Sequence, residues 1–83
     1  MRIDLIGNDH PGIVRDVTAV VVRHGLNIDA IDTDTRDAPW TGGRLFEAHI
    51  ALRLPRTFNA AALRQDLEGL ANEILVDLTV EEP

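Results

Sequence analysis

The sequence contains no cysteine, no lysine and no tyrosine. Without cysteine the chain can form no disulfide, thiolate zinc site or iron–sulfur cluster, and a small domain of this kind is typical of a reducing compartment. The 14 acidic residues outnumber the 8 basic ones and give a net charge of −6. Nucleic acids and anionic membranes attract clustered Lys and Arg, so neither is an expected partner. No apolar run reaches the length of a membrane span. We therefore expect a cytoplasmic protein.

The 83 residues, of which 45% are hydrophobic, fit one globular domain spanning 1–83. A domain of this size buries only about 60–65% of the surface that its unfolded chain exposes. Its stability should be modest, and association with a second domain would increase it.

Hydrophobic periodicity predicts six elements. Strands alternate inward and outward side chains, and the clearest has Phe46, Ala48, Ile50 and Leu52 on one face. The second strand changes phase near Ile31, which predicts a bulge there. In chain order the expected elements span residues 3–6, 11–24, 26–36, 45–54, 60–72 and 74–81. The first strand should end at Gly7, and Asn59 should cap the second helix.

The order β-α-β-β-α-β predicts an α+β, ferredoxin-like fold. In this arrangement two helices cover one face of a four-stranded antiparallel sheet with strand order 2-3-1-4. Since many unrelated functions share this fold, the function has to be argued from individual residues.

The turn between the first strand and the first helix has the most informative sequence, Asn8-Asp9-His10-Pro11-Gly12-Ile13-Val14. Proline suits the first helical position, which makes His10 the expected N-cap. The N–H groups of Gly12, Ile13 and Val14 would then point out of the helix end, where the helix dipole favours an anion. The alternative is a strand-to-helix connection that serves packing alone.

Catalytic and metal sites are not expected. Glu47 and His49 could pair as base and acid on one strand face, but no nucleophile or cofactor loop accompanies them, so we expect neither an enzyme nor a cofactor. Asp32 and Asp34 resemble the start of a calcium loop. The sixth position of that loop would be Asp37 where glycine is needed, so we expect no metal. Charges that discourage strand pairing at a sheet edge explain these aspartates better.

The chain resembles an ACT domain over nearly its whole length. The marks are Asp9-His10-Pro11-Gly12-Ile13-Val14 after the first strand and Gly25-Leu26-Asn27-Ile28 at the start of the second. Among ACT domains it is most similar to those of the glycine cleavage system transcriptional repressor type. The resemblance implies a regulatory domain that binds a small ligand, often an amino acid, and that pairs with a second ACT domain as a homodimer or in tandem.

In such domains the ligand lies between the turn of one domain and the second strand of its partner. Carried onto this chain, the resemblance implies two sets of ligand-binding residues. The first set is Asn8, Asp9, His10, Gly12, Ile13 and Val14, and the second is Asn27, Ile28 and Asp29. A zwitterionic amino acid fits, with glycine and serine as first candidates, because its carboxylate would meet the helix N–H groups and its ammonium Asp9 or Asp29. The alternative is a structural dimerisation module that binds no ligand.

Overall fold

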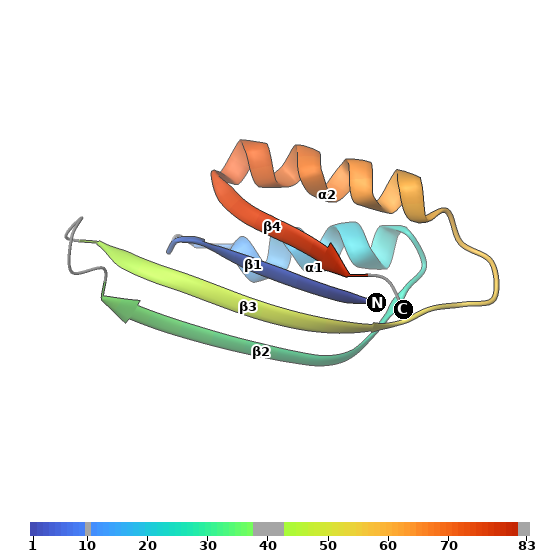
Figure 1. The fold of residues 1–83 in the computed structure, drawn as a ribbon, viewed down its shortest axis with the longest axis horizontal. Helices are drawn as coiled ribbons and strands as arrows, with labels where there is room; N and C mark the ends of the chain where they lie inside the picture. Colours follow the sequence, from blue (N-terminus) through green and yellow to red (C-terminus); the bar gives the residue numbers. More distant parts are fainter. Residues whose placement is uncertain (10, 38–42, 82–83) are drawn as a thin grey trace.

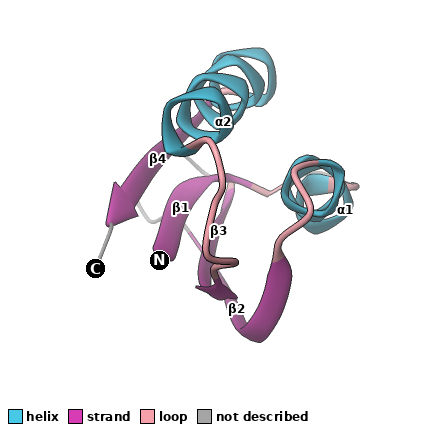
Figure 2. Cartoon of the chain, turned by 90° about the vertical axis from the view of Figure 1, so that its right-hand side faces the viewer, coloured by secondary structure: helices cyan, strands magenta, loops and turns pink. Residues whose placement is uncertain are grey.

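The computed structural model describes residues 1–9, 11–37 and 43–81. Its elements are β1 (Arg2–Asn8), α1 (Ile13–Arg23), β2 (Asn27–Asp37), β3 (Arg44–Arg53), α2 (Ala60–Ile74) and β4 (Val76–Glu81). The strands form one antiparallel sheet in the order β2-β3-β1-β4. Both helices lie on the same face of this sheet (Figures 1 and 2). The predicted ferredoxin-like fold is confirmed. Neither helix combines the length and the apolar character that a membrane crossing requires.

The core fills the space between the sheet and the helices. The alternating residues predicted for β3 lie in it, and Ala48 and Ile50 are each only 1% exposed. The helices contribute Val17, Leu63 and Leu67, which are completely buried. Because inward residues recur at a period of two in the strands and of about 3.6 in the helices, the same alternation that predicted the elements also predicted the core.

Gly7 lies inside β1, although we expected it to end that strand. It pairs with Phe46 of β3 and with Val76 of β4. A Cβ atom at position 7 would lie 2.6 Å from Cγ1 of Val76 and 3.0 Å from its Cα. The glycine therefore lets β4 approach β1 closely, which is a recognised use of glycine inside a strand.

Helix α1 begins two residues later than predicted. Its N-cap is Gly12, with a φ of 86°, so the prediction of His10 as N-cap and Pro11 as first helical residue is wrong. A left-handed residue interrupts the helical path at position 12, and glycine adopts that conformation without strain. His10 itself lies outside the described residues.

Helix α2 extends to Ile74, so β4 starts at Val76 and not at Ile74 as predicted. Ile74 packs against the core on the same helix face as Leu67 and Leu70. This helical packing places Ile74 in α2, although Ile74 also continues the alternating pattern of β4. Leu75 then ends the helix in the left-handed conformation, with a φ of 57°. Asn59 caps α2 as predicted, since its Oδ1 accepts the N–H of Ala62 at 3.0 Å.

Strands β2 and β3 form a long hairpin whose far end extends beyond both helices (Figure 1). The register shifts between Ile28 and Ala30, because Asp29 has no partner on β3. The predicted bulge is therefore present, but it lies two residues before the expected position at Ile31. Strand β2 is at the edge of the sheet, and all its residues except the half-buried Ile28 are exposed.

Candidate ligand-binding site

The turn after β1 is fixed to the sheet at its start. Asn8 pairs with Leu45 of β3, and the N–H of Asp9 donates to the carbonyl oxygen of Arg44 at 2.9 Å. The side chains of Asn8 and Asp9 are exposed, whereas Ile13 is 2% exposed and belongs to the core. Ile13 can therefore face a ligand only through its backbone, while Asn8 and Asp9 can use their side chains.

The start of α1 has two features that favour an anion, although Asp16 adds a negative charge to its first turn. The first N–H groups of an α-helix have no acceptor inside the helix, and the helix dipole adds positive potential there. The guanidinium of Arg15 also folds back over Gly12, since a Cβ on that glycine would lie 3.2 Å from Nη2 of Arg15. An anion at this helix end would meet both.

Arg15 is not among the site residues predicted from the sequence. It is the third residue of α1, a position where the helix dipole disfavours a cation. Its side chain is 84% exposed, and its Nε lies 3.8 Å from the carboxylate of Asp16. The unfavourable position of this basic residue was the signal in the sequence that could have drawn attention to it.

The second predicted set of residues lies at the start of β2. Asn27 is exposed opposite Arg53, and Ile28 is half-buried opposite Leu52. The carboxylate of Asp29 forms an ion pair with the Arg53 guanidinium at 2.8 Å. Asp29 is thus held at the bulge by a neighbouring cation, and a ligand ammonium would compete with Arg53 for it.

One chain does not bring the two sets together. Asn8 lies opposite Leu45 and Ile28 lies opposite Leu52, at the two ends of β3. At ~3.3 Å per residue, these positions on β3 are separated by ~23 Å. No single small ligand can contact both sets within one molecule.

The face of the sheet away from the helices carries a network of ion pairs. Asp4 accepts from Nδ1 of His49 at 2.6 Å and from Nε of Arg2 at 2.9 Å. The hydrogen bond with His49, followed by that with Arg2, lowers the pKa of Asp4 against the cost of partial burial. Glu47 pairs with Arg36 and lies 3.6 Å from Nε2 of His49. No group of three or more ligating side chains among the described residues could hold a metal ion.

Solved structures share this fold. An unknown protein from Galdieria sulphuraria is 32% identical and matches with a TM-score of 0.89 over 99% of this chain and 47% of that one. An ACT domain protein from Streptococcus pneumoniae is 24% identical, with a TM-score of 0.79 over 96% of this chain and 84% of that one. A structure described as a glycine cleavage system transcriptional repressor is 23% identical, with a TM-score of 0.60 over 99% and 45%.

Formyltetrahydrofolate deformylases also match, and the one from Pseudomonas putida has a TM-score of 0.82 at 17% identity. The chain spans 28% of that enzyme and about half of the Galdieria protein. No protein-family model and no curated protein matches the sequence. The ACT resemblance seen in the sequence is thus confirmed at the level of the fold: the chain has the fold of ACT domains, with the strand order β2-β3-β1-β4.

Proposed function

We propose that this chain is a cytoplasmic, non-catalytic regulatory domain that binds a small amino acid between two copies of itself. The observation that carries the proposal is the ~23 Å separation, along β3, of the two predicted sets of site residues. Each chain supplies half of a site at each end of the sheet. A second domain is needed to join the halves.

The exposed edge of β2 offers a surface through which two copies can pair and bring the two halves together. If two β2 strands pair antiparallel around a two-fold axis, the start of one strand lies beside the end of the other. The end of β2 is Asp37, which pairs with Arg44, and the carbonyl of Arg44 accepts the N–H of Asp9. Asn27 from the second copy would therefore come next to the Asn8–Val14 turn of the first.

The charges at the two halves suit a zwitterion. The ligand carboxylate would lie at the start of α1 beside Arg15, and its ammonium would meet Asp9 or the Asp29 carboxylate of the second copy. Glycine and serine are the first candidates. A ligand that binds only the folded dimer raises its melting temperature by mass action.

Subunit complementation tests this arrangement. Asn8→Ala removes the turn half-site and Asn27→Ala the strand half-site, so neither variant alone should be stabilised by the amino acid that stabilises the original chain. Mixed and allowed to exchange, the two should regain part of the thermal shift, because each mixed dimer holds one intact site. Asn72→Ala, at an exposed position of α2, is the control and should keep the full shift.

The alternative is a structural module that dimerises without a ligand. The Asp29–Arg53 ion pair favours it, because it already occupies one of the carboxylates that a ligand ammonium would need. This alternative holds if none of the common amino acids shifts the melting temperature of the intact dimer. If an amino acid stabilises the original chain but mixing the two variants restores none of the thermal shift, the site is not shared, and the ligand lies within one chain.

A further inference from the structure

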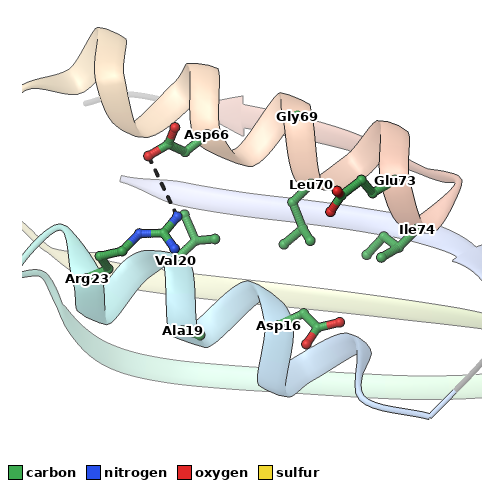
Figure 3. A pocket seen from close by; sticks show the side chains of 9 residues that line it. All are labelled: Asp16, Ala19, Val20, Arg23, Asp66, Gly69, Leu70, Glu73 and Ile74. Carbon is green, nitrogen blue, oxygen red and sulfur yellow. Dashed lines mark ion pairs between the residues drawn. The ribbon is translucent and has the colours of Figure 1, made fainter.

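A groove runs between the outer surfaces of α1 and α2, on the side of the molecule away from the sheet (Figure 3). It has a volume of ≈ 520 Å³, larger than the other described hollows in the surface. Its floor is apolar and consists of Val20 from α1 with Leu70 and Ile74 from α2. Leu70 and Ile74 are only partly buried, so apolar surface remains open to solvent in the groove.

Two small residues, Ala19 and Gly69, line this groove on the facing helices. Glycine inside a helix costs about 1 kcal/mol relative to alanine. A Cβ at position 69 would have no atom within 4 Å, so packing inside this chain does not require the glycine. The missing side chain instead leaves room for a backbone from outside to approach α2. Val22, one turn beyond Ala19 on α1, is an exposed apolar side chain outside the groove lining.

The rim of the groove is negatively charged. Asp16 and Glu73 stand at one end, shown at the right of Figure 3, and Glu73 forms no ion pair with any described residue. At the other end Asp66 lies 3.8 Å from Nη2 of Arg23 and 2.7 Å from Nε2 of His24. The carboxylate of Asp66 is therefore compensated. At the opposite end Asp16 lies 3.8 Å from Nε of Arg15, and Glu73 carries a negative charge with no ion pair among the described residues.

We propose that this groove docks a cationic amphipathic helix from a partner protein. The apolar side of such a helix would cover Leu70 and Ile74, and its backbone would pass closest at Gly69. Its Lys or Arg side chains would pair with Asp16 and Glu73. Helix-in-groove recognition of this kind depends on apolar anchors at helical spacing, with charges setting the orientation.

A labelled helical peptide tests the proposal. The probe is an acetylated and amidated peptide of about 18 residues built from Leu, Ala and Lys, with Leu at helical spacing. We expect it to bind the intact chain, and a matched peptide with Glu in place of Lys to bind at least about tenfold more weakly. Gly69→Leu fills the groove with a better helix former, so the chain should stay folded while affinity falls at least about tenfold.

Two double variants separate docking from general charge attraction. Asp16→Asn with Glu73→Gln should weaken binding as strongly as Gly69→Leu does. Asp32→Asn with Asp34→Asn removes the same charge from β2, outside the groove, and should leave affinity nearly unchanged. Equal weakening by both double variants, normal affinity of Gly69→Leu, or no binding at about 1 mM peptide would each overturn the proposal. So would a change in the sedimentation of the chain alone on Gly69→Leu, because the groove would then bind a second copy.

Discussion

At position 7 the sheet has no room for a side chain. In Gly7→Ala the new methyl group would meet Cγ1 and Cα of Val76, and the second of these is backbone that cannot rotate away. We expect the variant to lose about 1–3 kcal/mol of unfolding free energy, the usual range for overpacking. Urea denaturation would measure it. Gly69→Ala is the matched control and should gain up to about 1 kcal/mol, because its Cβ meets nothing and alanine favours the helix.

Asp4 should make the stability of the folded chain depend on pH in the acidic range. Its pKa in the folded state is below the ordinary value of 3.8, chiefly through the hydrogen bond with His49. A carboxyl whose folded pKa is depressed contributes stability above its unfolded pKa, and this stability is lost as the pH falls through the folded pKa. Between about pH 5 and pH 2, unfolding midpoints should therefore fall less steeply in Asp4→Asn than in the original chain.

His49→Ala tests the cause of that dependence. Removing the imidazole takes away the largest contribution to the lowered pKa of Asp4, so the acid-dependent loss should shrink and move toward ordinary carboxyl values. Asp32→Asn is the comparison, since its carboxylate forms no ion pair among the described residues. If His49→Ala leaves the pH profile unaltered, the hydrogen bond between the two side chains does not control Asp4.

At the scale of elements, the two helices start differently. The Asn59 side chain caps α2, whereas α1 starts at a glycine that has no side chain to do so. Asn59→Ala should cost about 1 kcal/mol in urea denaturation, and Asn59→Asp should restore most of it because aspartate caps equally well. Asn72→Ala, near the other end of α2, serves as the control. A loss of equal size in Asn59→Asp would show that Asn59 acts through another contact.

The same elements show how far the sequence predicts the fold. β3 and α2 were predictable because each repeats its period over many residues and has a clear boundary signal, Pro55 after β3 and Asn59 before α2. Gly7, Gly12 and Ile74 were misjudged because their roles depend on a neighbouring strand, a left-handed φ and a helix face. None of these is a local property of the sequence.

The candidate site was predictable only in part, for a related reason. Family resemblance indicated both sets of site residues, and the topology places them at opposite ends of β3. Arg15 was not predicted, because its side chain folds back onto Gly12, three residues earlier, and this contact depends on the side-chain conformation. The Asp29–Arg53 ion pair depends likewise on the register of β2 against β3.

At the scale of the whole molecule, the negative charge should oppose the dimer and favour the peptide. β2 carries four aspartates and one arginine, so pairing two copies brings eight carboxylates (2 × 4) along one seam. Salt screens such repulsion, because the Debye length shortens as the ionic strength rises. Raising the salt from about 20 mM to about 500 mM should therefore strengthen association of the chain, measured by sedimentation. The groove attracts an opposite charge, so the same change should weaken binding of the Lys peptide.

Two double variants test whether these opposite salt dependences arise from the named carboxylates. Asp32→Asn with Asp34→Asn should strengthen the dimer at low salt and flatten its salt dependence, because two of the four aspartates in each copy are gone. Asp16→Asn with Glu73→Gln should leave the dimer unchanged and flatten only the salt dependence of the peptide. Dimerisation that weakens with salt would show that ion pairs hold the copies together and would argue against β2 edges as the seam. Because the two double variants remove equal charge, net charge alone cannot produce both results.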